Sequence, residues 1–215
     1  MSSIPPPTTR LSARPRGRPR DPARLDRMLS AAREQFAQLG LEGSSMDGIA
    51  EASGVSKVTL YKYFPSKEAL FNATVNEPVR QALDLDIASL DPGNPREALL
   101  RVAQSYLGLI TDAAVIQHVR MLNASGARNV DLSTSFLESG PEAVITTLIK
   151  YLRACDRVRS LRIAHAQDAA EQFAAMVRGN EQLRLILGLQ CRRTGAQTRR
   201  YCAACVEVFL KGYAA

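Results

Sequence analysis

A short basic and aromatic segment, residues 56–63, carries the side chains in this sequence best suited to contact a polyanion. Once Leu60 is buried, with Phe64 just beyond it, the remaining side chains include no acid. The outward side chains are Lys57, Val58, Thr59, Tyr61, Lys62 and Tyr63. Lysine donates to guanine edges, threonine and valine offer methyl groups to thymine, and phenols reach phosphates. A solvated helical face normally mixes both signs of charge. The segment therefore predicts a helix that contacts double-stranded DNA, with an ordinary surface helix as the alternative.

The residue types needed for catalysis or metal binding do not fall into a recognisable pattern. The two histidines, His118 and His165, stand apart in the sequence, and neither has the patterned partner that a nucleophilic triad needs. The sequence contains no Gly-rich phosphate loop and no metal-ligand spacing. We therefore expect a protein that is not an enzyme and that holds no cofactor and no metal.

All four cysteines lie in the last third of the chain, at positions 155, 191, 202 and 205. Cys202 and Cys205 have a C-x-x-C spacing, which is typical of metal or redox sites. The sequence has no second such pair, and these two share one face of an expected helix, where cysteine behaves as a small hydrophobe. We interpret them as packing residues, with redox gating through Cys202 and Cys205 as the alternative.

Composition and charge restrict the class of protein further. The 215 residues are 46% hydrophobic and 23% charged, and the net charge is +7. This composition excludes a wholly disordered chain, and no run approaches the ~20 apolar residues that span a bilayer. The first ten residues lack the apolar region of a secretion signal, so we expect a cytoplasmic protein that does not contact a membrane.

The basic excess lies in residues 1–80 and, more strongly, in residues 150–200, whereas residues 81–149 are acidic overall. A basic excess favours polyanionic partners without choosing among them. The C-terminal arginines are Arg153, Arg157, Arg159, Arg162, Arg192 and Arg193. We interpret them as a solvated face, with contact to an anionic effector as the alternative.

Residues 1–20 are rich in proline and arginine, have little apolar content, and predict a disordered basic arm. Within the arm, Arg16 and Arg18 flank Gly17 between two prolines, which matches the core of an AT-hook. Two arginines around a glycine suit a narrow A·T minor groove, and the arm directly precedes the first expected helix. Minor-groove contact is therefore the hypothesis, and a tail that only attracts phosphate is the alternative.

Apolar residues recur at helical spacing along the rest of the chain, and no run alternates like a strand. The first helix begins at Pro22 after the capping Asp21, and Gly40 stops it. Ser44 and Asp47 form a capping pattern for a second, short helix, and Ser66 caps a fourth. The later helices are expected at residues 96–111, 114–123, 141–155, 166–187 and 198–213. The fold class is all-α, with about nine helices.

Residues 53–55 read as a tight turn between the second helix and the segment 56–63, because Gly54 adopts a left-handed backbone easily. Two short helices joined by such a turn form a helix-turn-helix, in which the second helix enters a major groove.

The residues of this motif carry a family resemblance. The stretch GSSMDGIAEASGVSKVTLYKYFPSKEAL, residues 43–70, resembles the DNA-binding region of the tetracycline-repressor (TetR) family, and the likeness extends over residues 24–75. Further on, Glu171-Gln172-Phe173 with Arg178-Gly179, and the closing residues 208–213, are similar to the C-terminal domain of AefR-like members.

The resemblance implies a homodimer whose two recognition helices enter successive major grooves of a palindromic operator. Carried over by position, Lys57, Val58, Thr59 and Lys62 would face bases, and Ser45, Tyr61, Tyr63 and Lys67 would hold phosphates. It further implies division into the arm, a helix-turn-helix unit at residues 21–66, and a helical bundle at residues 67–215 for effector binding and dimerisation. The expected function is a ligand-released repressor at the nucleoid. A DNA-binding regulator without a small-molecule effector, gated by a partner or by oxidation, is the alternative.

Two further sets of residues are assigned to the larger unit. A cavity for an unknown, largely apolar effector would be lined by Tyr106, Ile110, His118, Met121, Leu122 and Phe136. A four-helix dimer interface would use Phe173, Met176, Val177, Ile186, Tyr201, Cys205 and Phe209. For both sets the alternative is that the side chains serve only the core of one chain.

Overall fold

The computed structural model describes residues 22–75, 79, 82, 90–125 and 130–215. Within these ranges the chain is helical, with a single isolated β-bridge between Leu161 and Ala214, so the all-α prediction is confirmed. The helices are α1 (Pro22–Gly43), α2 (Met46–Ser53), α3 (Lys57–Tyr63), α4 (Lys67–Ala73), α6 (Pro95–Thr111), α7 (Ala113–Ser125), α8 (Val130–Ser139), α9 (Pro141–Arg157), α10 (Ala166–Arg178), α11 (Glu181–Ile186) and α12 (Gly195–Gly212).

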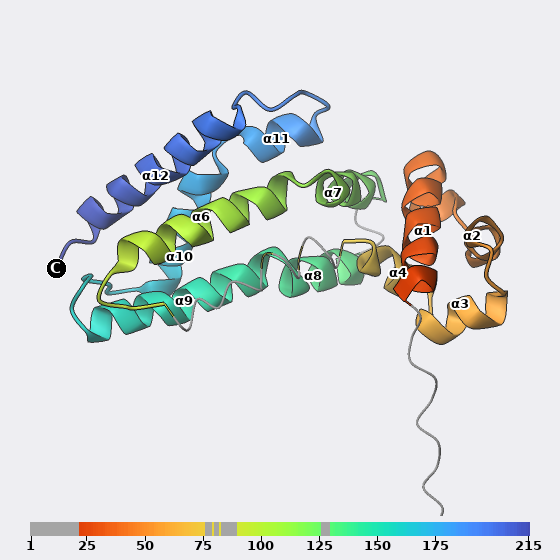
Figure 1. Cartoon of the computed structure of the whole chain (residues 1–215), viewed down its shortest axis with the longest axis horizontal. Coiled ribbons are helices and arrows are strands. Elements are labelled where there is room, and N and C mark those ends of the chain that lie inside the picture. Colours follow the sequence, from red (N-terminus) through yellow and green to blue (C-terminus); the bar gives the residue numbers. More distant parts are fainter. Residues whose placement is uncertain (1–21, 76–78, 80–81, 83–89, 126–129) are drawn as a thin grey trace, which may run out of the picture.

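Helices α1 to α3 gather at one end of an elongated molecule (Figure 1). Met28, Ala32 and Phe36 recur along one face of α1 and are fully buried. The predicted stop at Gly40 is a kink with φ of 70°, after which a last helical turn reaches Gly43. Helix α2 packs on α1, and α3 packs on α2, so the first helix holds the motif from behind.

The turn between α2 and α3 has the conformation that the sequence predicts. Gly54 is left-handed, with φ of 67° and ψ of 27°, and its N–H donates to the carbonyls of Ala50 and Glu51. Ser56 then caps α3, because its side chain accepts from the N–H of Thr59. The turn fixes the direction in which α3 leaves α2.

Three details of the sequence-based prediction are wrong. The N-cap of α2 is Ser45, whose side chain accepts from the N–H of Gly48, whereas Ser44 is buried and donates to the carbonyls of Gln35 and Gly40. The stretch at residues 166–187 is two helices, α10 and α11, because Gly179 breaks it. Helix α8 was not expected, and with it the described residues contain eleven helices where about nine were proposed.

The remaining helices form a bundle in which α6, α9 and α12 are the longest members (Figure 1). Helix α10 packs against α6, α9 and α12, which places Phe173 and Val177 at the centre of the core. In the described ranges no single helix is long and apolar enough to cross a membrane. Only α6 together with residues 113–124 passes such a test, as a pair bent by 54°.

Two contacts join the bundle to the first three helices. Helix α4 packs against α1 on one side and α8 on the other, and α7 packs against α1. Arg33 of α1 also donates to the carbonyl of Thr74, just after α4. Helix α4 therefore lies between the helix-turn-helix and the part of the bundle that holds α7 and α8.

Candidate DNA-binding surface and ligand cavity

Helix α3 presents its polar and aromatic side chains to solvent and buries only Leu60 fully. Val58 is 80% exposed and Tyr61 43% exposed, so an apolar and an aromatic side chain of this helix are open to a partner. Lys57 and Lys62 are exposed as well, and Thr59 and Tyr63 are half-buried. The residues predicted to face bases thus lie together on an outward face.

Lys57 has a partner that the sequence analysis missed. Its ammonium lies 2.7 Å from a carboxylate oxygen of Asp47, on the first turn of α2. The hydrogen bond to this acid raises the pKa of Lys57. Both side chains are largely exposed, so water screens the pair and it adds little stability. Helix α3 contains no acid, but its first lysine is paired with an acid of α2.

Two predicted phosphate contacts also have structural roles. The hydroxyl oxygen of Ser45 accepts from the N–H of Gly48, 3.1 Å away, and its proton is left for another acceptor. The Lys67 ammonium donates to the carbonyl of Ser44 over 3.1 Å, which ties the start of α4 to the end of α1. Arg16 and Arg18 of the predicted arm lie outside the described residues.

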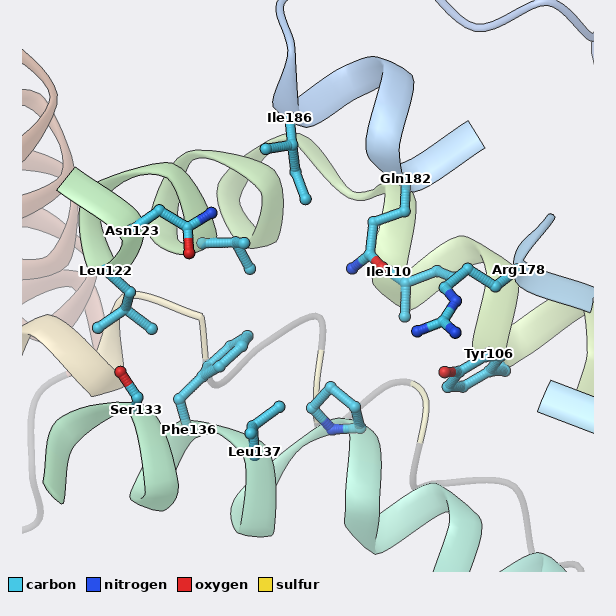
Figure 2. A pocket seen from close by; sticks show the side chains of 12 residues that line it. Tyr106, Ile110, Leu122, Asn123, Ser133, Phe136, Leu137, Arg178, Gln182 and Ile186 are labelled. Atoms are coloured by element: carbon cyan, nitrogen blue, oxygen red, sulfur yellow. The ribbon is translucent and has the colours of Figure 1, made fainter. Parts of the chain in front are cut away.

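A cavity of about 280 Å³ opens in the bundle between α6, α7, α8, α10 and α11 (Figure 2). Its lining is mostly apolar, with a few polar side chains, as is typical of small-molecule sites. The lining residues are Tyr106, Ile110, Val119, Leu122, Asn123, Ser133, Phe136, Leu137, Pro141, Arg178, Gln182 and Ile186.

Four of the residues predicted for an effector cavity line this one, namely Tyr106, Ile110, Leu122 and Phe136. His118 and Met121 are not among its lining residues. His118 is fully buried behind the lining, between the rings of Phe71 and Phe136, and Met121 is half-buried at the edge of the core. Sequence reasoning missed Arg178, the last residue of α10, and Gln182 of α11. Gln182 was missed because α11 was expected to continue α10 rather than to fold over the cavity.

His118 is unusual among the buried side chains. Its ring stacks on Phe71 of α4 at a centroid distance of 3.8 Å and lies 4.7 Å from the ring of Phe136 on α8. Neither ring nitrogen has a hydrogen-bond partner in the described part of the chain. Burial lowers the pKa of His118 to about 4, so the imidazole is neutral at pH 7.

Helix α11 is fastened over the cavity at both ends. Glu181 at its start is buried, forms a 2.8 Å ion pair with Arg193, and accepts from the N–H of Arg192. At its end, the guanidinium of Arg120 on α7 donates to the carbonyls of Leu185 and Ile186. These contacts hold Gln182 and Ile186 of α11 against the cavity.

Most residues predicted for the dimer interface are buried inside the single chain, and this part of the prediction needs correction. Phe173, Val177, Cys205 and Phe209 are buried in the bundle core, so they have almost no surface left for a second subunit. Ile186 lines the cavity from α11. Met176 and Tyr201 are half-buried, and the Tyr201 hydroxyl donates to the carbonyl of Met176.

The cysteine pair packs as predicted. Cys202 and Cys205 are buried, and both are free thiols. Burial raises the pKa of both thiols, which lowers the fraction of reactive thiolate. Among the described residues, no cluster of histidine, cysteine and acidic side chains could hold a metal ion.

The fold and these two sites define a class: a helical protein that presents a helix-turn-helix at one end and a ligand-sized cavity in the adjoining bundle. A family model for bacterial regulatory proteins of the tetR family matches residues 28–74. A second model, for the C-terminal domain of AefR-like transcriptional repressors, matches residues 97–215. The chain belongs to the TetR family, whose members are DNA-binding transcriptional regulators and not enzymes.

Individual relatives agree with this assignment. The transcriptional regulator RutR of Escherichia coli K12 is 41% identical over 87 residues, which are 40% of this chain and 39% of that protein. The chain therefore spans about two-fifths of the curated relatives that it matches. The solved structure of the flavonoid-responsive regulator FrrA is 35% identical, with 89% of this chain and 97% of that chain covered and a TM-score of 0.71. A TetR-family structure from Mesorhizobium loti MAFF303099, 23% identical, covers 92% and 100% of the two chains with a TM-score of 0.75 and supports the fold.

Proposed function

We propose that this chain is a homodimeric repressor that binds a palindromic operator through α3 and leaves it when a small molecule enters the bundle cavity. The observation that carries the proposal is the outward face of α3, where Val58 and Tyr61 stand in solvent beside two lysines. Apolar and aromatic side chains so exposed gain surface contact in a major groove. The protein would act in the cytoplasm at the nucleoid.

Dimerisation is proposed through α10 and α12, with side chains different from those first expected. The outer face of α12 carries Ala203, Ala204 and Val208, and Val208 is 59% exposed. Ala175 on α10 and Leu183 on α11 add exposed apolar surface. Small side chains allow close approach of two helix pairs, and an operator with two-fold symmetry needs two copies.

The proposed signal passes from the cavity to the helix-turn-helix through aromatic rings. Phe136 lines the cavity, His118 lies against Phe136, and Phe71 of α4 lies against His118. Phe71 in turn meets Phe36 of α1 edge to face at 5.1 Å. A ligand that shifts α8 would move α4, and the two α3 helices of a dimer would change their spacing. The ligand can change the equilibrium between the DNA-binding and the released conformation only by the difference in its affinity for the two, typically ~1–3 kcal/mol.

A small-molecule effector is supported by the cavity and by the relative FrrA, which responds to flavonoids. FrrA matches this chain over nearly its whole length, cavity-bearing bundle included. An aromatic effector fits the ring of Phe136 and the apolar residues around it.

Selection of bound duplexes from a random library would test the proposal, combined with the mass of the protein in solution. We expect a two-fold symmetric sequence with half-sites about 34–36 Å apart, or a multiple of one helical turn. A monomeric mass, or enrichment of single half-sites, would contradict the homodimer. A thermal-shift panel then separates a small-molecule effector from gating by a partner, and operator binding with and without oxidant tests gating through Cys202 and Cys205.

A further inference from the structure

The polar side chains of the cavity are not spread evenly over its wall. Figure 2 shows Tyr106, Arg178 and Gln182 at one end, and Asn123 and Ser133 toward the opposite end. The other lining side chains are apolar, namely Ile110, Val119, Leu122, Phe136, Leu137, Pro141 and Ile186. This division suits a ligand with an apolar body and polar groups at its ends.

Arg178 is the one charged residue among the lining residues. Its guanidinium points into the cavity beside the Tyr106 hydroxyl (Figure 2). None of the described carboxylates forms an ion pair with it. Burial raises the pKa of Tyr106, and the positive charge of Arg178 is near enough to offset part of that rise.

The backbone at this end holds Arg178 in place. Arg178 is the last residue of α10, and Gly179 after it has a φ of 49°. A Cβ atom at Gly179 would lie 2.7 Å from the Tyr201 hydroxyl, so the close packing of α12 requires glycine there. Helix α11 then starts at Glu181, whose ion pair with Arg193 fixes the turn and brings Gln182 to the same end of the cavity.

From this arrangement we infer that the effector is an amphipathic acid, an apolar and preferably aromatic body with one anionic group that Arg178 binds. This inference deepens the proposed ligand response and rests on it. A wholly apolar ligand at this end would displace water from the Arg178 guanidinium without accepting a hydrogen bond from it, which costs free energy. A carboxylate, sulfonate or phenolate at this end would instead form a charge-assisted pair with Arg178, and Gln182 could donate a further hydrogen bond.

A position at the end of α10 is by itself favourable for an arginine, because the helix dipole attracts a cation there. That effect does not require the side chain to turn into a cavity. Arg178 is exposed along part of its side chain, yet its guanidinium lies at the cavity wall beside Tyr106 and Gln182, and this placement is what a ligand-binding role explains.

Two fluorescent probes of nearly the same shape test the inference. The probe 1-anilinonaphthalene-8-sulfonate has an aromatic body with one anionic group, and N-phenyl-1-naphthylamine is the same body without the sulfonate. Both are titrated into the full chain and into Arg178→Met, Arg178→Lys and a control, Arg101→Met. Arg101 is a surface residue of α6 that pairs with Glu97, away from the cavity lining. Thermal unfolding checks that each variant is folded.

We expect Arg178→Met to lower the preference for the sulfonate over the neutral probe about tenfold, since hydrogen bonds between charged groups are stronger than those between neutral groups. Arg178→Lys should restore part of the preference, and Arg101→Met should keep all of it. Ile186→Trp, which fills the cavity, should weaken both probes and so place them there. An unchanged preference in Arg178→Met, sulfonate binding that survives Ile186→Trp, or a wild-type chain that does not bind the sulfonate would overturn the inference.

Operator release separates this inference from the function on which it rests. If the neutral probe releases DNA to the same extent as the sulfonate, the ligand-released mechanism is supported and the proposed role of Arg178 is wrong. If the sulfonate binds through Arg178 and the protein stays on the operator, the anion-binding role of Arg178 is supported and the ligand-released mechanism is wrong.

Discussion

The imidazole of His118 lies flat on the phenyl ring of Phe71, with 3.8 Å between the ring centroids and 17° between the ring planes. His118 belongs to α7 in the bundle, and Phe71 belongs to α4, which packs on α1. The stack therefore joins the wall of the cavity to the helices that hold α3. Its histidine is fully buried, and this gives the junction a dependence on pH.

Stability should fall as the pH drops below 7. The folded-state pKa of His118, about 4, lies below the unfolded value of about 6.5, so the unfolded chain binds the proton first. The stability contributed by neutral His118 is complete above pH 6.5 and is lost as the pH falls toward 4. Urea unfolding at pH 7 and pH 5 should show this loss, with about 2 kcal/mol from His118 alone. His118→Phe should abolish this contribution to the loss of stability between pH 7 and pH 5. His165→Phe, a change at an exposed position, should leave the contribution unchanged.

Gly54→Ala should destabilise the protein by about 1–2 kcal/mol, because an alanine at a φ of 67° is strained even though no atom lies within 4 Å of the added Cβ. The matched control is Gly108→Ala within α6, where the space is equally open and φ is not left-handed. That change should stabilise by about 0.5–1 kcal/mol. Equal effects in thermal or urea unfolding would show that the left-handed turn is not what Gly54 provides.

Lys57→Ala should weaken binding to the selected operator by about 1–3 kcal/mol and leave binding to unrelated duplexes nearly unchanged, because a base contact carries sequence information. Asp47→Asn is the companion variant, since Asp47 holds the Lys57 ammonium in the free protein. Without the acid, affinity for operator should rise. Electrophoretic mobility shifts on operator and random duplexes measure the affinities of both variants. Equal losses of affinity for the two duplexes in Lys57→Ala would rule out base contact.

Lys67→Ala should instead reduce affinity for every duplex and lower the slope of log affinity against log salt by about 1, as expected for one lost phosphate contact. The same change removes the hydrogen bond to the Ser44 carbonyl and should cost about 1 kcal/mol of stability. Lys211→Ala, an exposed lysine of α12 far along the chain from the motif, is the control. A salt slope identical to wild type would mean that Lys67 serves only the fold.

Removal of residues 1–20 should leave thermal unfolding and solution mass unchanged and reduce operator affinity, because the arm with Arg16 and Arg18 is predicted to contact a neighbouring minor groove. Arg16→Ala together with Arg18→Ala in the full chain should reproduce most of the loss, and a preference for A·T flanks should vanish with it. Unchanged operator affinity would show that residues 1–20 do not contribute to DNA binding.

Features set by neighbours in the chain could be predicted from the sequence. The left-handed Gly54, the cap at Ser66 and the outward face of α3 depend on contacts between residues close together in the chain, so residue spacing predicts them directly. The one-residue error at Ser44 and Ser45 arose because only Ser44 has an acid, Asp47, three residues further on, as the capping pattern requires. Burial of Ser44 against α1 left Ser45 as the cap.

The cavity and the junction were decided by tertiary structure. Helical periodicity shows that Phe173 and Val177 face a core, but one apolar stripe suits a neighbour in the same chain as well as a second subunit. Arg178 lies at the cavity because α10 packs against α6, and a glycine break with the Glu181–Arg193 ion pair places Gln182 of α11 beside it. Likewise, the packing of both α4 and α7 against α1 brings His118 to Phe71, which lies 47 positions earlier in the chain. Local spacing specifies which face of each helix is apolar, whereas the element that covers that face depends on how all the helices pack together.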